Sequence, residues 1–382
     1  MAATGPGGTG APAPEKIALA QVRVFDGHRV REPGTVVIDG TVIGTDPAGA
    51  RVIDGDGGVL LPGLIDAHIH LSGVETLEQL SSYGVTTGLD MGTWPPARVD
   101  SLRGHSGLTD IRSAGVGAAS PASRHAQIAG RPPEGLVAGP QEAARYVADR
   151  VAEGSDYIKI IIDLPGFDQA TVDALVTAAH EHGKLAITHA SSAGAVAMAQ
   201  RSGTDVITHV PLDVALDGDA AELMRAGQRA AVPTLAMMEA IVENVRRAGA
   251  ANGPAYAPAR DSVAALHRAG VPILAGTDAN VTPGVPASPP FGDSLHHELE
   301  LLTGAGLSAV EALRAATVLP ARHFGLADRG VIKPGRRADL VLLAGDPVAD
   351  IRASRLIQRI WCAGRERAPA SGASGQVPVS RH

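Results

Sequence analysis

The sequence predicts an α/β protein: a (β/α)8 TIM barrel with a small β-sandwich domain formed by the N- and C-terminal segments. Two observations support this prediction. Strand-like apolar runs alternate with helical patterns through the middle of the chain, and short strand-like runs separated by tight turns occupy both ends. A barrel of this kind takes about 250 residues. The 382-residue chain therefore has room for the barrel and one smaller domain.

Residues 17–60 and 332–367 are expected to form the small β-sandwich domain. Asp39 and Gly40 are a typical hairpin signal between two apolar runs. A similar run of short strands returns near the C-terminus, and a short sheet needs a partner to cover its apolar face. We therefore expect the two ends to pair. Residues 1–16 and 368–382, rich in Gly, Pro, Ala and Ser, are expected to be a disordered leader and tail.

Residues 61–331 are expected to form the barrel. Helical spacing of apolar residues predicts helices over 140–153 and 168–182, among others. Eight strand-like runs separate the helical stretches and are expected at 60–70, 85–92, 111–119, 156–163, 184–190, 205–210, 230–237 and 271–278. Active sites of such barrels lie where the strands end and the loops begin.

Composition excludes several classes of function. The net charge is −7 and the basic residues are scattered, which disfavours a nucleic-acid partner. No uninterrupted apolar run is long enough for a membrane span. The single cysteine, Cys362, cannot form an internal disulfide. We expect a cytoplasmic protein that acts on a small-molecule substrate, and assembly into a homo-oligomer is left open.

The segment Leu60–His70 ends in a His-x-His motif. Side chains alternate between the two faces of a strand, so His68 and His70 point the same way and can reach one ion. Ile69 points away into packing. Two polar residues that merely close a half-buried strand are the alternative interpretation of this motif taken alone.

Four further strand-like runs also carry a metal-ligand type of side chain. Lys159, His189, His209 and Asp278 lie at or near the ends of these runs. Because strand ends meet at one mouth of a barrel, the five runs together predict a single metal site.

The ordered series of motifs resembles the amidohydrolase superfamily, and within it the imidazolonepropionase-like and prolidase-like members. The resemblance extends from about Ile17 to Arg365 and is carried by LPGLIDAHIHL, YGVTTGLDMG, SDYIKI, AAHEHGKLAITHA, DVITHVPLD, ILAGTDAN, LSAVEALRAATVLPA and GVIKPGRRADLVLLAGDP. It implies a binuclear centre of two divalent metal ions, zinc being the first expectation, with manganese, cobalt or iron as alternatives.

The resemblance also implies how the ligands are shared. His68, His70 and Asp278 would hold one ion, and His189 and His209 the other. Lys159, after carbamylation by CO2, would bridge the two ions, whereas an ion-paired barrel lysine near Asp156 and Asp163 is the alternative. Asp278 would in addition be the catalytic residue, taking a proton from the bridging hydroxide that attacks the substrate and passing it to the leaving group.

His125 and Tyr157 are weaker candidates for substrate binding. His125 lies in the loop after the third strand, and a solvated loop histidine is the alternative. Tyr157 lies two residues before Lys159 on the same face of its strand, and packing inside the barrel is the alternative. Where many prolidase-like members have a glycine- and histidine-rich segment after the third strand, this chain has ASPASRHAQIAGRPP, which puts recognition of a dipeptide carboxylate in doubt.

These observations predict a metal-dependent hydrolase that cleaves an amide-type C–N bond in a dipeptide, an N-acyl amino acid or a cyclic amide. A lactone, ester or carbamate hydrolase on the same site is an alternative, since those substrates pass through the same kind of intermediate. A mononuclear deaminase is another, although AlaSerSer rather than a glutamate follows His189. A catalytically silent scaffold is a third, against which the complete ligand set counts.

Overall fold

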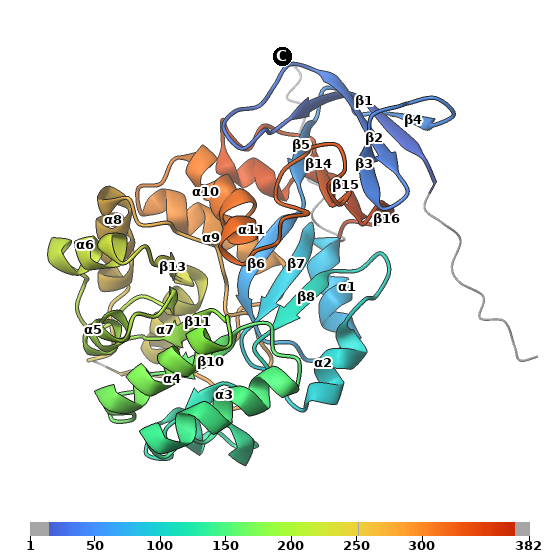
Figure 1. Cartoon of the computed structure of the whole chain (residues 1–382). Coiled ribbons are helices and arrows are strands. Elements are labelled where there is room, and N and C mark those ends of the chain that lie inside the picture. Colours follow the sequence, from blue (N-terminus) through green and yellow to red (C-terminus); the bar gives the residue numbers. More distant parts are fainter. Residues whose placement is uncertain (1–14, 251, 371–382) are drawn as a thin grey trace, which may run out of the picture.

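The computed structural model describes residues 15–250 and 252–370, in which strands and helices alternate along most of the chain (Figure 1). The strands are β1 Ile17–Val24, β2 Gly34–Asp39, β3 Val42–Gly44, β4 Arg51–Asp54, β5 Val59–Pro62, β6 Leu64–Ile69, β7 Val85–Asp90, β8 Asp110–Ser113, β9 Ala118–Ala119, β10 Ile158–Ile161, β11 Ala186–His189, β12 Val206–Thr208, β13 Ala230–Val232, β14 Leu340–Leu343, β15 Ile357–Cys362 and β16 Arg365–Arg367.

Along the chain, the α-helices lie between β6 and β14. They are α1 Val74–Ser82, α2 Pro96–Leu102, α3 Ala143–Ala152, α4 Gln169–Glu181, α5 Ala193–Ser202, α6 Gly218–Ala226, α7 Leu235–Arg247, α8 Ala257–Ala269, α9 Asp293–Gly304, α10 Ala309–Ala315 and α11 Val318–His323, with short 3-10 turns η1 His125–Gln127, η2 Pro133–Gly135, η3 Pro140–Glu142 and η4 Ile351–Arg355. No helix within the described ranges is both long enough and apolar enough to cross a bilayer.

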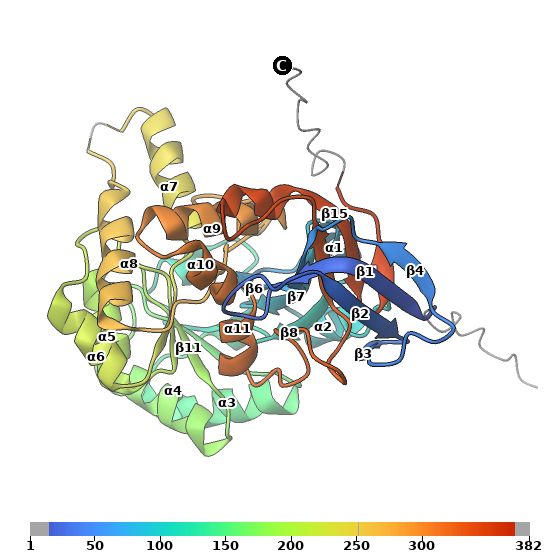
Figure 2. The ribbon, with the colours of Figure 1, turned by 90° about the horizontal axis from the view of Figure 1, so that it is seen from above.

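Strands from both ends of the chain share one sheet. Its order is β16-β15-β14-β5-β1-β2-β3, with β4 also paired to β1. β5 pairs in parallel with β1 and antiparallel with β14, so it lies between the two terminal segments. Leu19, Ile38, Leu60 and Trp361 are fully buried in one apolar cluster on this sheet. Figure 2 shows these strands gathered on one side of the molecule and helices α4–α8 on the other.

Two predictions made for the terminal segments can be set beside the structure. The Asp39–Gly40 hairpin is found between β2 and β3, and Gly40 has φ +63°, which a residue without a Cβ adopts at little cost. The predicted disordered leader and tail lie almost wholly outside the described residues.

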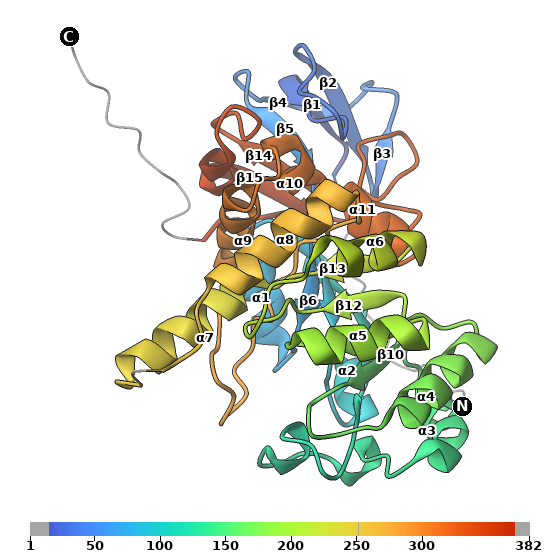
Figure 3. The ribbon, with the colours of Figure 1, turned by 90° about the vertical axis from the view of Figure 1, so that its left-hand side faces the viewer.

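The middle of the chain contains parallel strands that alternate with helices. β6, β7 and β8 form one parallel sheet, and β9 to β13 form a second in the order β13-β12-β11-β10-β9. In Figure 3, helices α4, α5, α6 and α8 lie outside β10–β13. The predicted α/β class and strand direction are therefore found, but the pairings do not make one continuous closed sheet.

Four predicted strands differ from the structure, each for a local reason. The run at 60–70 is divided at Gly63 into β5 and β6, because the Gly63 N–H donates to the Asp339 carbonyl whereas Leu64 N–H donates to the Gly84 carbonyl beside β7. The run at 111–119 is divided into β8 and β9, because Gly115 between them has φ +63°. The run at 230–237 ends at Val232, since Pro233 and Thr234 stop the strand before α7 begins. The run at 271–278 makes a single isolated bridge, from Ile273 to Ala231. Its backbone still bonds to β13 and β6, through Leu274 N to the Ala231 carbonyl and Asp278 N to the His68 carbonyl.

The two predicted helices are found with small shifts. The prediction over 140–153 corresponds to η3 followed by α3, because Pro140 begins a 3-10 turn. The prediction over 168–182 corresponds to α4, where the Asp168 side chain accepts a hydrogen bond from Thr171 N and caps the helix.

Candidate metal centre

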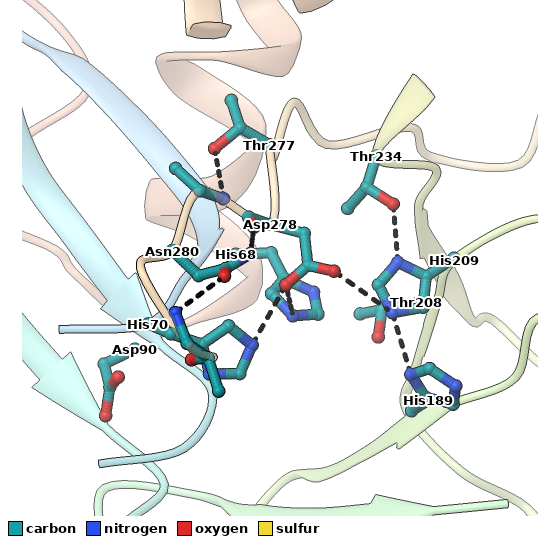
Figure 4. A network of polar contacts seen from close by, with 12 residues as sticks. His68, His70, Asp90, His189, Thr208, His209, Thr234, Thr277, Asp278 and Asn280 are labelled. Atoms are coloured by element: carbon teal, nitrogen blue, oxygen red, sulfur yellow. Dashed lines mark hydrogen bonds and ion pairs between the residues drawn. The ribbon is translucent and has the colours of Figure 1, made fainter. Parts of the chain in front are cut away.

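His68 lies near the end of β6, His70 directly follows β6, and both face Asp278 (Figure 4). β6 is buried along its whole length, which holds the His68 ring at 1% exposure. The Nε2 atoms of His68 and His70 lie 3.3 Å and 3.0 Å from the same carboxylate oxygen, Oδ1 of Asp278. The two histidines thus point the same way, as the alternation of side chains predicts.

The Asp278 backbone turns sharply where it meets β6. Its φ is +57°, in the left-handed region that a residue with a side chain rarely adopts, and its N–H donates to the His68 carbonyl at 2.7 Å. Asp278 Oδ2 lies 3.9 Å from His209 Nε2. The carboxylate therefore stands between the β6 histidines and the histidines of the next sheet.

His189 ends β11, and His209 directly follows β12. His209 Nε2 lies 2.9 Å from His189 Nδ1, and His209 Nδ1 lies 2.5 Å from Thr234 Oγ1. Because β11 and β12 are neighbours in a parallel sheet, their carboxyl ends bring the two rings together.

Lys159 projects from β10 and is 3% exposed. Its Nζ donates to Thr208 Oγ1 at 2.8 Å. Neither predicted ion-pair partner contacts it: Asp156 pairs with Arg103, and Asp163 bonds to His125. Burial lowers the pKa of the Lys159 ammonium to about 7, although nearby carboxylates oppose that shift.

The electrostatics of the group favour a bound cation. Burial, helped by the Lys159 charge, lowers the pKa of His68 to about 3, and burial also lowers the pKa values of His189 and His209 well below the usual range. Burial acts to raise the pKa of Asp278, but the charges and hydrogen bonds of the histidines outweigh it and hold that pKa well below its usual value. Burial acts to lower the pKa of His70, but the hydrogen bond and charge of Asp278 outweigh it and raise that pKa. The three imidazoles whose pKa is lowered offer lone pairs to a metal ion, and the ionised carboxylate offers negative charge.

The donor set fits divalent metal ions. His68, His70 and Asp278 place three ligand atoms within 4.8 Å of one another. In the described part of the chain, the buried His68 Nδ1 and His189 Nε2 atoms have no hydrogen-bond partner. Imidazole and carboxylate donors suit zinc and also accept manganese, cobalt or iron.

A second cluster borders the first. His125, Asp163 and His189 also place ligand atoms within 4.8 Å. The Asp163 carboxylate accepts hydrogen bonds from His125 N at 2.9 Å and from His125 Nδ1 at 2.8 Å, so His125 is not a free loop histidine. Burial acts to raise the pKa of Asp163, but the bonds and charge of His125 outweigh it and lower that pKa.

Tyr157 does not face the ligand group. It is 3% exposed, and its hydroxyl donates to the carbonyls of Asp90 and Arg112 at 3.0 Å and 3.1 Å. Its ring packs edge-on against Phe324. The structure thus corrects the prediction of substrate binding in favour of the packing alternative. Tyr157 is on the same face of the strand as Lys159, but it lies closer to the amino end of the strand and so away from the ligand group.

Two buried carboxylates outside the predicted ligand set hold the histidine strand in place. Asp66 accepts from His68 N at 3.1 Å and from Thr277 Oγ1 at 2.7 Å, which ties β6 to the segment that carries Asp278. Asp90 accepts from Leu71 N at 3.1 Å, just beyond His70. Asp66 precedes His68 by two residues and so shares its face of β6.

Several known proteins are similar to this chain over most of its length. The sequence model of the Amidohydrolase family matches residues 59–367. An uncharacterised protein of Mycobacterium tuberculosis is 29% identical over 342 residues, covering 81% of this chain and 85% of that protein.

Two further relatives carry named activities. An adenine deaminase of Methylobacterium sp. is 28% identical over 392 residues, or 94% of this chain, which spans only 62% of that protein. An imidazolonepropionase of Deinococcus deserti is 25% identical over 387 residues, covering 88% and 92% of the two chains.

Among solved structures, a candidate prolidase from Bifidobacterium longum superposes with a TM-score of 0.79 at 26% identity, covering 95% of this chain and 97% of that one. Together these similarities confirm the resemblance to imidazolonepropionases and prolidases that the sequence motifs indicate.

Proposed function

The chain belongs to the amidohydrolase family, and from this premise we propose that it is a binuclear metal-dependent hydrolase that cleaves an amide-type C–N bond in a small substrate. The substrate class is a dipeptide, an N-acyl amino acid or a cyclic amide. The observation that supports this most is the contact of one Asp278 oxygen with the Nε2 atoms of both His68 and His70, with His209 on the other oxygen.

In this proposal the residues divide between two ions. His68, His70 and Asp278 would hold the first, His189 and His209 would hold the second, and Lys159, as a carbamate, would supply a further anionic ligand. An ammonium cannot bind a cation, whereas a lysine with a pKa of about 7 is neutral often enough to react with CO2 and become an anionic ligand. When bound, two divalent ions, zinc first among them, polarise a substrate carbonyl and activate water.

Asp278 is the proposed proton-transfer group of the reaction. It is the anionic group of the cluster, and its carboxylate lies within 4 Å of three imidazoles, so it can accept a proton at an oxygen and return it to the leaving nitrogen. His125 lies beside His189 with its Nδ1 held by Asp163, and its ring is the group proposed to contact the substrate.

The parallel strands are proposed to be a (β/α)8 barrel whose eighth strand position is taken by residues 271–279, which bond to β13 and β6. The proposed domains are this barrel over 61–331 and a β-sandwich of 17–60 with 332–367. We also propose a cytoplasmic location, for which the lone, buried Cys362 is the support.

Deamination is the second candidate, favoured by the similarity to an adenine deaminase. Hydrolysis of a lactone, ester or carbamate is compatible with the same ligands. The two reaction classes differ in product, because only deamination of an exocyclic amine releases ammonia from an intact ring.

A hydrolysis screen of the metal-loaded protein tests the proposal, across dipeptides, N-acyl amino acids, cyclic ureas, lactones and adenine. His70→Ala is the blank, and His182→Ala is the matched control because His182 is exposed on the surface. We expect turnover of an amide by the unaltered protein and by His182→Ala only. Ammonia release from adenine without amide cleavage would favour deamination, and an absence of bound metal would overturn the proposal.

A further inference from the structure

Thr234 occupies the N-cap position of α7 without capping the helix. Threonine hydroxyls at this position normally accept a hydrogen bond from the first turn. Thr234 instead has φ +50° and ψ +48°, makes no side-chain cap, and places Oγ1 2.5 Å from His209 Nδ1. Its side chain serves the metal centre, and the first turn of α7 needs another acceptor.

Glu298 supplies that acceptor from a different helix. Its two carboxylate oxygens accept hydrogen bonds from Leu235 N at 3.0 Å and from Ala236 N at 2.7 Å. Glu298 projects from α9 and is fully buried. A buried carboxylate at a helix N-terminus is favoured by the free N–H groups and by the positive end of the helix dipole.

The contacts made by His209 and by Glu298 meet at Thr234. A β-branched residue in the left-handed region is strained and persists only where its surroundings hold it. Glu298 accepts a hydrogen bond from Leu235 N, directly after Thr234, and His209 contacts the Thr234 hydroxyl. The conformation of Thr234 is thus held from both sides.

We propose that Glu298 is a positioning residue of the metal centre, which acts through Thr234 to set the tautomer of His209. With Thr234 held in place, its Oγ1 accepts the Nδ1–H of His209, and the Nε2 lone pair is left for a cation. This inference rests on the proposed function, because it requires His209 to be a metal ligand. Hydrogen-bond partners behind ligating histidines set the tautomer and ring orientation in this way.

The test compares Glu298→Gln and Thr234→Val with Ser308→Ala. A glutamine keeps the size of Glu298 but can offer an oxygen to only one of the two N–H groups. Valine keeps the shape of Thr234 without the hydroxyl. Ser308→Ala is the matched control, because it removes the side-chain cap of α10 and its capping box with Glu311. Thr234→Ser is the conservative variant expected to restore the behaviour.

Two readouts are needed, both at pH 8.5. Burial raises the pKa of Glu298 to about 8, so at this pH the carboxylate form, in which both oxygens are acceptors, predominates. Competition with a chelator gives the zinc affinity, and 15N chemical shifts of the metal-free protein give the His209 tautomer. We expect zinc to bind about 10- to 100-fold more weakly in Glu298→Gln and Thr234→Val, and His209 to lose its uniform Nδ1–H form. Ser308→Ala and Thr234→Ser should match the unaltered protein.

Equal tautomer populations in Glu298→Gln and Ser308→Ala would overturn the inference, whatever the metal affinity. If the unaltered protein binds no zinc, the proposed function fails, and the tautomer measurement still decides whether Glu298 sets the His209 ring. Near-ultraviolet circular dichroism of each variant identifies any that does not fold. If Glu298→Gln fails to fold, Thr234→Val compared with Thr234→Ser decides the same question.

Discussion

His189 Nδ1 lies 2.9 Å from His209 Nε2 at the ends of neighbouring strands, with His209 buried and His189 half-buried. Burial keeps both imidazoles neutral, so at most one of these two nitrogens carries a proton. A divalent cation shared by the two nitrogens would satisfy both lone pairs. The close contact of these two nitrogens therefore supports the proposal that His189 and His209 hold a second metal ion.

Asp278→Asn is expected to remove most of the activity while metal stays bound. An asparagine keeps an oxygen for the ion but cannot accept the proton, and loss of a general base costs about 100-fold or more in kcat. Steady-state kinetics together with metal analysis of the same preparation measure this. A variant that kept a large part of the activity would assign Asp278 to metal binding alone.

Lys159→Met is expected to lower the metal content from about two ions per chain to about one, because the bridging anion is lost. Short carboxylic acids added to the variant should restore part of the activity by replacing the carbamate. Lys333→Met is the control, since Lys333 is exposed on the surface. Unchanged metal content in Lys159→Met would show that Lys159 is a structural lysine bonded to Thr208.

Asp163→Asn is expected to lower kcat about 10-fold with the metal retained, because His125 loses the carboxylate that accepts its Nδ1–H and N–H. Asp149→Asn, at an exposed position on α3, is the control. Full activity in Asp163→Asn would remove His125 from the substrate-facing residues. Loss of one metal ion would instead assign the His125, Asp163 and His189 cluster to metal binding.

His296 is expected to make the protein less stable in acid. It is fully buried, with Nε2 3.0 Å from the Tyr83 carbonyl and Nδ1 3.0 Å from Ser354 Oγ. Burial lowers its pKa to about 4, below the 6.5 of an unfolded chain. The neutral ring therefore contributes stability above pH 6.5, and at most about 3 kcal/mol of it is lost as the pH falls toward 4.

Urea unfolding of the unaltered protein and of His296→Gln between pH 7.5 and 4 checks this expectation. The free energy of unfolding should fall less steeply with acid in the variant, whatever its stability at pH 7.5. His182→Gln, altered at an exposed histidine, should follow the unaltered protein. Parallel profiles for His296→Gln and the unaltered protein would contradict the assignment.

The ligand-type residues could be identified from the sequence because each lies near the end of an apolar run. Alternation along β6 correctly placed His68 and His70 on one face, and strand ends that meet at one mouth accounted for His189, His209 and Asp278. Alternation gives a face but not a depth, which is why Tyr157 was grouped with Lys159 although it packs against Phe324.

Contacts between distant segments could not be predicted in the same way. Glu298 reaches the start of α7 from more than 60 residues away, and the hydroxyl of Thr234 turns to His209 because its backbone is left-handed. Neither residue belongs to a short motif. The break between β8 and β9 had a visible signal in Gly115, but a glycine inside a run does not by itself decide between a bend and a bulge.

The position of β5 between β1 and β14 has a consequence for synthesis on the ribosome. β5 directly precedes the strand that carries His68, and one of its edges stays unpaired until residues 340–343 have been translated. An unpaired edge is a template for association with other chains. Nascent chains should therefore be most prone to aggregate, and most in need of chaperones, just before β14 emerges.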